Sequence, residues 1–166
     1  GKREGPGKDE IFAANEDATK RYQKAVLQSP EAAPAREYLK KRALDVAACK
    51  EWGIGYSPEG WGFLSDAAGP RNGPQMKALE AAGLLSTNEK GNLYDRFRGR
   101  VMFTIRDELG RAVGFSGRVL KADDKAGGKY VNTPETPVFR KSRILFGLDK
   151  AKREILDARQ ALLVEG

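Results

Sequence analysis

The stretch VMFTIRDELGRAVGFSGRVL, residues 101–120, decides the fold of this chain. Val101–Arg106 predicts a strand, Asp107–Gly110 a turn, and Ala112–Leu120 the antiparallel partner strand. Glycines at positions 114 and 117 interrupt the second strand. Such glycines indicate a bulge, or a place where another backbone or a ligand comes very close. The segment therefore predicts an antiparallel sheet in the second half of the chain.

Shorter elements surround this hairpin. A second hairpin is predicted where 84–86 and 92–94 flank the turn 88–91. Further along, 123–128 is typical of a flexible loop tip and 148–158 of a helix. Residues 161–164 form an apolar run typical of a buried strand, which ends at Glu165.

The first half of the chain is predicted to be rich in helix. Apolar residues recur at helical spacing over 11–28, and further helices are expected over 32–42, 61–68 and 74–82. Asp45 is a suitable N-cap for a short helix that Gly53 ends. Residues 54–56 are expected to be extended. The fold class is therefore α+β, with an α-rich first half and a small antiparallel sheet, with a basic face, in the second.

Length and composition exclude several classes of protein. The chain has 166 residues, of which 40% are hydrophobic, with one Cys and no His. A single Cys excludes an internal disulfide framework, and the absence of His removes imidazole bases and argues against a zinc site. No apolar run approaches the roughly 18 residues of a membrane-spanning helix.

Positive charge is concentrated in one segment. The net charge is +7, and residues 86–146 carry 13 Lys and Arg against seven Asp and Glu. Such clustering points to a polyanionic partner such as a nucleic acid. A basic surface that is merely solvated stays open as the alternative.

Two segments carry residues suited to nucleic-acid binding. Arg96, Arg98 and Arg100 alternate with Phe97, so an extended backbone would place all three guanidinium groups on one face, where they suit phosphates. Within the segment 129–143, Lys129 and Lys141 could reach phosphates, Tyr130 could stack on a base, and Asn132 could read a base edge. A solvated β face and a structured loop are the alternatives. Arg118, directly after Gly117, adds a cation on the partner strand.

Glu165 is the one carboxylate with a position suited to catalysis. It follows the apolar run 161–164 and precedes Gly166. A carboxylate at the end of a buried strand can bind a metal ion or act as an acid or base. An isolated acid at a strand end is more often plain surface.

Several motifs in the same order resemble the catalytic core of bacterial-type (DnaG) replicative DNA primases. They are 96–107 with 110–118, KYVNTPET at 129–136, 139–148, YLKKRA at 38–43, and WGIGYSP with a following GW at 52–61. The resemblance runs from about residue 11 to the end of the chain. Thr104 stands where the family has Pro, Ser116 where it has Gly, and Ala43 where it has Gly.

The resemblance implies a domain division and an activity. Residues 1–10 would be a flexible leader, 11–159 the N-terminal subdomain of the core, and 160–166 the first strand of a truncated Toprim subdomain. Such primases are nucleotidyltransferases that make short RNA primers on single-stranded DNA from ribonucleoside triphosphates, with Mg²⁺ or Mn²⁺. Glu165 would be a catalytic and metal-binding glutamate of an incomplete site, so this chain alone is expected to be inactive. Zn²⁺ would bind a domain that precedes residue 1.

The resemblance also implies binding residues and partners. The template and nucleotide contacts would be Arg42, Arg96, Arg98, Arg118, Lys129, Tyr130 and Lys141. The partners would be the single-stranded template, nucleoside triphosphates, the RNA–DNA hybrid and, through a separate C-terminal domain, the replicative helicase. The implied location is the bacterial cytoplasm, at the nucleoid and away from membranes. Two alternatives stay open: a stand-alone single-strand-binding module, and the primase domain of a phage or plasmid primase-helicase.

Overall fold

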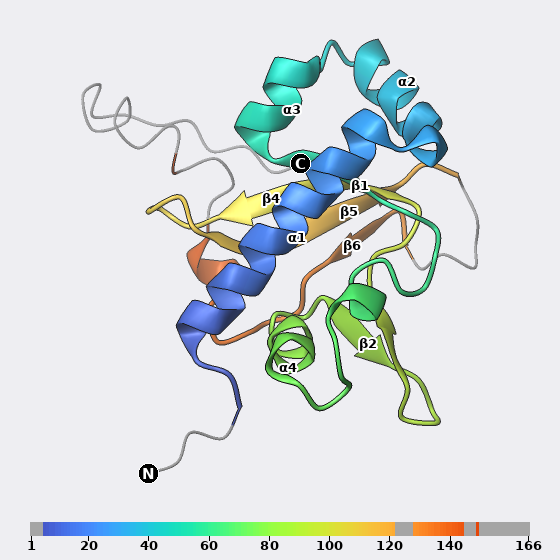
Figure 1. The fold of residues 1–166 in the computed structure, drawn as a ribbon. Coiled ribbons are helices and arrows are strands. Elements are labelled where there is room, and N and C mark those ends of the chain that lie inside the picture. The colour runs from blue at the N-terminus through green and yellow to red at the C-terminus, as the bar shows by residue number, and fades with distance from the viewer. Residues whose placement is uncertain (1–4, 122–127, 145–148, 150–166) are drawn as a thin grey trace.

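The computed structural model of the chain describes residues 5–121, 128–144 and 149 (Figure 1). The predicted elements 148–158 and 161–164 lie outside this description, apart from Asp149, which is helical. Glu165 and most of the predicted loop tip 123–128 also lie outside it.

The described strands form a four-stranded antiparallel sheet and a separate two-stranded sheet. In the larger sheet the strand order is β1-β4-β5-β6, and β2 pairs with β3 in the smaller one. The bounds are Ile54–Ser57 for β1, Leu85–Thr87 for β2, Leu93–Asp95 for β3, Arg100–Arg106 for β4, Ala112–Val119 for β5 and Tyr130–Asn132 for β6.

The central hairpin that the sequence predicts is confirmed. Strands β4 and β5 pair antiparallel around the turn 107–110, and Ile105 lies opposite Gly114 while Arg106 lies opposite Ala112. Val113 is therefore the extra residue of a β-bulge beside Gly114, as the strand glycines indicated. The departure at Thr104 leaves β4 regular, with its amide donating to the Gly53 carbonyl.

Helices occupy most of the first half, as predicted, with different ends. The longest, α1, begins at Lys8, so three residues assigned to the leader belong to it. The predicted helix 61–68 is instead a turn followed by a short 3-10 helix, η2. The bounds are Lys8–Gln28 for α1, Pro30–Ala32 for the 3-10 turn η1, Ala33–Lys41 for α2, Val46–Trp52 for α3, Ser65–Ala67 for η2, Pro74–Ala81 for α4 and Lys141–Arg143 for the 3-10 turn η4.

Helix α1 lies across one face of the larger sheet (Figure 1). Its Tyr22 ring meets the Phe115 ring of β5 edge to face at 5.4 Å, and Thr19 accepts a hydrogen bond from Thr104 of β4. A Cβ at Gly55 of β1 would lie 2.5 Å from the Tyr22 carbonyl carbon. The close crossing of helix and strand therefore requires a residue without a side chain at position 55.

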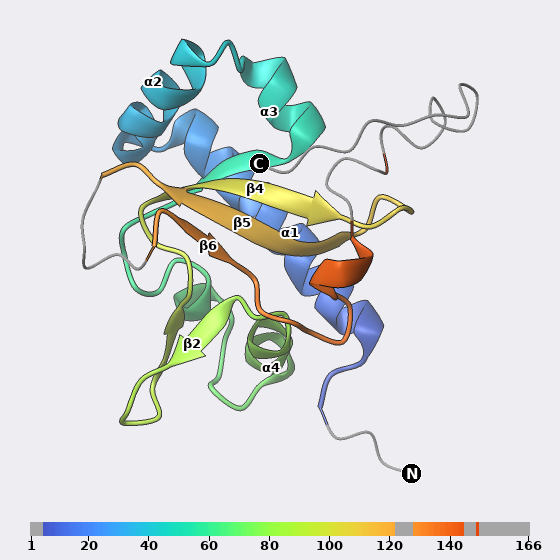
Figure 2. The same cartoon turned by 180° about the vertical axis from the view of Figure 1, so that it is seen from behind.

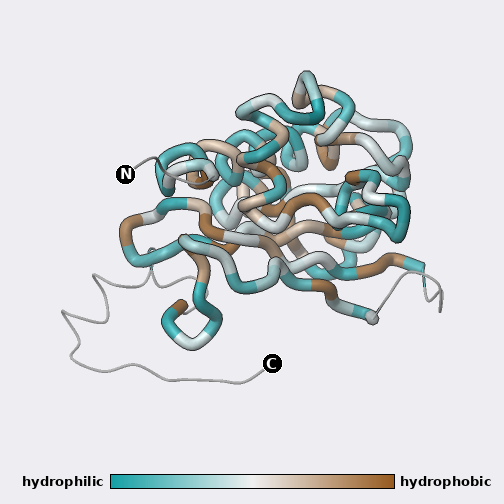
Figure 3. The backbone as a smooth tube through the Cα atoms, turned by 90° about the horizontal axis from the view of Figure 1, so that it is seen from below, coloured by the Kyte–Doolittle hydropathy of each residue, from teal (hydrophilic) through white to brown (hydrophobic). Residues whose placement is uncertain are grey.

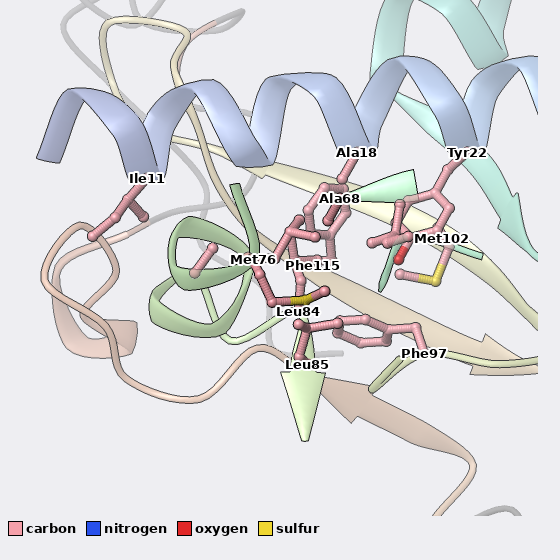
Figure 4. Packing of buried hydrophobic residues seen from close by; sticks show 13 residues of the cluster. Ile11, Ala18, Tyr22, Ala68, Met76, Leu84, Leu85, Phe97, Met102 and Phe115 are labelled. Carbon is pink, nitrogen blue, oxygen red and sulfur yellow. The ribbon is translucent and has the colours of Figure 1, made fainter. Parts of the chain in front are cut away.

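The main core lies under α1. Figure 4 shows Ile11, Ala18 and Tyr22 on the underside of the helix, directed toward Met76 of α4 and Phe115 of β5. A second buried cluster joins the end of α1 to α2, α3 and β1. It contains Val26, Ala32, Ala35, Leu39, Cys49, Ile54, Tyr56 and Val101. The two clusters fix α1 on one side of the sheet and α2 beside its β1 edge.

On the opposite face of the sheet, Val101 and Phe103 of β4 pack in the second buried cluster with residues of α2, whereas over β5 and β6 the described residues include no α-helix (Figure 2). Side chains alternate between faces along a strand. On β4 and β5, Met102 and Phe115 on the α1 side are fully buried, whereas Phe103, Ser116 and Arg118 on the opposite side are half-buried. We call this second side the open face.

Hydrophobic and hydrophilic positions alternate along the chain (Figure 3). Such alternation is expected of elements that bury one side and expose the other. None of the helices within the described ranges is both long and apolar enough to span a membrane.

Helix α2 ends in a Schellman motif with an unusual residue at its centre. The Ala43 amide donates to the Lys40 carbonyl and the Leu44 amide to the Leu39 carbonyl. Ala43 has φ 56°, in the left-handed region that normally takes Gly. The departure from the family pattern at this position therefore places a Cβ where the backbone disfavours one.

We expect Ala43→Gly to stabilise the chain by about 0.5–1 kcal/mol, because glycine adopts the left-handed conformation without steric cost. Urea unfolding followed by circular dichroism measures the change. Ala47→Gly, inside α3 and also exposed, is the matched control and should destabilise by about 1 kcal/mol. A loss of stability in Ala43→Gly would contradict the interpretation.

Candidate nucleic-acid interface

Arg118 joins the open face of the sheet to helix α2. It lies opposite Tyr130 of β6, and its Nη1 donates to the Tyr130 hydroxyl oxygen at 2.9 Å. Its Cζ lies 5.0 Å from the ring centre of Tyr38 on α2 and 5.5 Å from that of Tyr130. The hydrogen bond to Tyr130 raises the pKa of the Arg118 guanidinium, which therefore stays cationic.

Arg42 reaches the same aromatic residue from the end of α2. Its Cζ lies 3.7 Å from the ring centre of Tyr38, within the range of a cation–π contact. Tyr38 and Arg42 are four residues apart, so they share one side of the helix. Arg42, Tyr38, Arg118 and Tyr130 thus form one group of alternating cations and rings, which we call the tyrosine–arginine cluster. Three of the predicted site residues meet here.

A second contact of this kind lies before β4. The Cζ of Arg98 stands 3.9 Å from the ring centre of Trp61 and 5.3 Å from that of Tyr94. Arg98 Nη1 also donates to the Asp95 carbonyl at 2.6 Å. Trp61 is 62% exposed, so much of its ring is accessible to a ligand. An exposed indole beside a guanidinium is a stacking surface for a nucleic-acid base.

Buried Asp95 holds the loop that carries Trp61. Its carboxylate accepts from the Leu64 amide at 2.8 Å and the Ser65 amide at 3.1 Å, and its own amide donates to the Trp61 carbonyl. Burial raises the pKa of Asp95, while the hydrogen bonds from the two amides act to lower it. The position of Trp61 is therefore fixed by the strand β3 that precedes Arg98.

The three alternating arginines do not share a face. Arg96 is half-buried, and its Nε donates to the Asn132 carbonyl of β6 at 3.1 Å. Arg100 is 2% exposed, and its Nη1 donates to the Gly117 carbonyl at 3.0 Å and the Gly128 carbonyl at 3.1 Å. The prediction of a common face is wrong for Arg100, because Gly99 has φ 62° and turns the chain before β4 begins.

Lys129 and Lys141 are both exposed but lie at different ends of the sheet. Lys129 directly precedes Tyr130, and its carbonyl accepts from the Val119 amide, beside the tyrosine–arginine cluster. Lys141 begins η4, where its amide donates to Glu135, and the neighbouring Arg143 lines a cavity with Arg106 and Arg111 of the β4–β5 hairpin. The structure therefore brings six of the seven predicted binding residues to one end of the sheet and leaves Lys141 apart.

Sequence reasoning assigned no role to Trp61, Tyr38 or Tyr94. The sequence does contain a signal for Tyr38, because this residue lies one helical turn before Arg42 and can therefore contact it. The signal for Trp61 is weaker: it is a large aromatic residue directly after a turn. Tyr94 packs edge to face against Trp61 at 5.3 Å, a contact between separate segments that no local pattern indicates.

The metal site implied for Glu165 lies outside the described residues. Within 5–121, 128–144 and 149, no group of three His, Cys, Asp or Glu side chains is placed to hold a metal ion. The chemistry that follows from the described side chains is the binding of anions and rings.

An α+β domain whose open sheet face carries cations interleaved with aromatic rings is typical of nucleic-acid-binding proteins. Comparison with known proteins then gives the family. Residues 22–152 match the N-terminal domain of the DNA primase catalytic core, and the chain belongs to this family. The resemblance drawn from the sequence motifs is confirmed.

Relatives agree with this assignment. The chain is 48% identical over 156 residues to the DNA primase of Mycolicibacterium smegmatis. The aligned region covers 94% of this chain and 24% of that protein. It is 45% identical over 140 residues to the DNA primase of Salmonella typhimurium, covering 84% of this chain and 23% of that one. The chain thus spans about a quarter of the length of these relatives.

Solved structures share the fold. The RNA polymerase domain of Mycobacterium tuberculosis primase DnaG superposes with a TM-score of 0.87 at 44% identity, over 96% of this chain and 51% of that one. A DnaG primase catalytic domain bound to single-stranded DNA superposes with a TM-score of 0.79 at 41% identity, over 88% of this chain and 46% of that one. The α+β fold predicted from the sequence is confirmed.

Proposed function

We propose that this chain is the template-binding part of a primase core, and that it holds single-stranded DNA against the open face of its sheet. The observation that carries the proposal is the tyrosine–arginine cluster. Arg118 and Arg42 share the ring of Tyr38, at 5.0 and 3.7 Å, beside the exposed ring of Tyr130. Guanidinium groups suit phosphates and the rings suit bases, so the cluster matches both parts of a single strand.

The proposed mechanism gives each predicted residue a task. Arg42, Arg118 and Lys129 contact successive phosphates near α2, and Tyr130 stacks on a base. Arg98 and Arg96 continue the contacts toward Trp61, which offers a second stacking surface. Lys141, at the far end of the sheet, is assigned to nucleotide or template further along the strand. Phosphoryl transfer depends mainly on positioning and charge neutralisation, and these residues supply positioning of the template.

For the whole enzyme we propose the activity of a DNA primase, a nucleotidyltransferase that copies the template into an RNA primer from ribonucleoside triphosphates. Divalent metal ions, Mg²⁺ or Mn²⁺, would supply charge neutralisation at the reacting phosphate. Glu165 is the proposed ligand from this chain. The RNA–DNA hybrid as product, contact with a replicative helicase, and a place in the cytoplasm at the nucleoid belong to the same proposal. The solved relative that contains a zinc-binding domain, from Aquifex aeolicus, supports Zn²⁺ as a ligand of a separate domain.

Titration of fluorescently labelled single-stranded DNA across a range of salt tests the template-binding proposal. Each phosphate contact lowers log K by roughly 0.7 per unit of log salt concentration for a single strand. With five or six cationic contacts we expect a slope of about −3.5 to −4. The same strand with an uncharged methylphosphonate backbone is the control and should not bind at these concentrations. A slope near zero, or no binding of the natural strand at low salt, would overturn the proposal.

A further inference from the structure

A groove of about 380 Å³ lies beside the proposed path of the strand. The start of α2, the loop after β1 and the end of β5 form its walls. Glu31 and Glu59 line it together with Arg96 and Arg98, and Trp61 contributes an exposed ring. Its volume falls within the roughly 300–1,000 Å³ of small-ligand sites.

The two carboxylates of the groove are held in place by neighbouring groups. Glu31 Oε1 accepts from the Glu59 amide at 2.6 Å and from the Tyr56 hydroxyl at 3.3 Å. Burial first, and then Glu31, raises the pKa of Tyr56, so this hydroxyl remains a donor. Glu59 Oε1 lies 3.6 Å from Lys121 Nζ. Within the described residues nothing donates to Oε2 of either glutamate, so each keeps an acceptor for a ligand.

The groove presents both acceptors and donors. Its two carboxylates lie among four cationic lining residues, Arg96, Arg98, Arg100 and Lys121, so a base edge with both donors and acceptors can pair with it. A base edge that presents adjacent N–H donors suits a carboxylate, and one that presents acceptors suits an arginine. Guanine carries both, with donors at N1 and N2 and acceptors at O6 and N7. Thymine has a single donor between two acceptors.

We propose that this groove binds an unstacked guanine base, whose N2–H donates to Glu59 and whose N1–H donates to Glu31. Arg96, which lines the same groove, is the proposed donor to O6 and N7, and the face of the Trp61 indole that Arg98 leaves open is the proposed stacking surface. The proposal rests on the template-binding function, because the strand that delivers the base lies on the open face. It adds a preference for guanine to a surface that otherwise binds phosphates through its cations and bases through stacking.

A strand of thymidylates with one central guanine measures the preference. Anisotropy at low salt gives its Kd, beside strands in which inosine, adenine or thymine replaces the guanine. Inosine lacks the N2 amino group and keeps O6 and N7. We expect the guanine strand to bind roughly 5- to 10-fold more tightly than the inosine strand, in line with the loss of one hydrogen bond to the groove.

Glu59→Gln and Glu31→Gln locate the preference. Each removes a negative charge, which strengthens binding of every strand alike, so the ratio of the guanine and inosine Kd values is the readout. We expect the ratio to fall to about 1 in the Glu59→Gln variant, which loses the contact to N2, and to change less in the Glu31→Gln variant, because guanine and inosine both keep N1–H. Glu51→Gln, an exposed glutamate on α3 that does not line the groove, is the matched control and should keep the ratio.

Two results overturn the inference. One is a ratio near 1 in the unmodified chain, and the other is a ratio that both glutamate variants retain. Binding of the thymidylate strand separates the two proposals: if it persists while the ratio is near 1, only the guanine site fails, and if it is absent, the template-binding function fails as well.

The guanine base in the groove could come from the template strand or from a free nucleotide. Competition with guanosine monophosphate distinguishes these two sources. Displacement of the guanine strand by this nucleotide, lost in Glu59→Gln, assigns the groove to a free guanine nucleotide. A strand preference without displacement assigns it to a template base. Both results support a guanine site at Glu59.

Discussion

Replacing Arg98 and Arg118 together by Ala is expected to weaken the binding of single-stranded DNA about 100-fold. Each guanidinium lies against a ring and retains donors that can reach a phosphate. A hydrogen bond to a charged group contributes about 1.5–3 kcal/mol, so two such contacts contribute about 3 kcal/mol or more. The slope of log K against log salt should also become shallower by about 1.4.

Two controls separate this effect from a general loss of charge. Lys20→Ala with Lys24→Ala removes two exposed cations from α1, on the other side of the sheet, and should lower affinity less than about threefold. Tyr130→Phe removes the hydroxyl that accepts from Arg118 but keeps the ring, and should have a smaller effect than the double arginine variant. Equal losses in the arginine and lysine variants would show that the open face is not the binding surface.

Local signals predicted the elements that depend on neighbours in sequence. Asp45 accepts from the Ala48 amide at 2.8 Å as the N-cap of α3, and Gly53 ends that helix at φ 63°. The hairpin of β4 and β5 followed from two apolar runs on either side of a turn. In both cases the decisive contacts span few residues, so the sequence pattern carries them.

Contacts between distant segments were not predictable in the same way. Residues 54–56 were expected to be extended, but their pairing with β4, with Gly55 opposite Met102, has no local signature. Arg100 was expected on a charged face and is instead buried against Gly117. A Cβ at Gly117 would lie 3.0 Å from Arg100 Cδ, so the space for this arginine is made by a residue on another strand.

The candidate site shows the same division. Cationic residues were identified from the sequence because charge and spacing are visible there. The aromatic partners were missed because Tyr38 meets Arg118, and Trp61 meets Arg98, only after folding. From a motif alone, an arginine can be either an ordinary surface cation or a binding group. An aromatic ring packed beside it favours the binding role.

Gly55→Ala is expected to cost about 3 kcal/mol of unfolding free energy, the upper end of the range for overpacking. The new Cβ would lie 2.5 Å from the Tyr22 carbonyl carbon and 2.6 Å from its Cβ. Both atoms belong to Tyr22 of α1, and neither can rotate away. The clash is therefore relieved only if the helix moves away from β1. For a chain of this length such a loss lowers Tm by about 10 °C.

Gly60→Ala is the matched control for this substitution. A Cβ at Gly60 meets nothing within 4 Å, and the residue is exposed, so its effect should stay within about 0.5 kcal/mol. Thermal unfolding followed by circular dichroism compares the two variants, and equal Tm values would refute the close-crossing argument. Because Gly55 contacts α1 on the side of the sheet away from the open face, the folded Gly55→Ala chain should bind single-stranded DNA within about twofold of the unmodified chain well below its Tm. A larger loss of binding would show that the position of α1 is transmitted through the sheet to the tyrosine–arginine cluster.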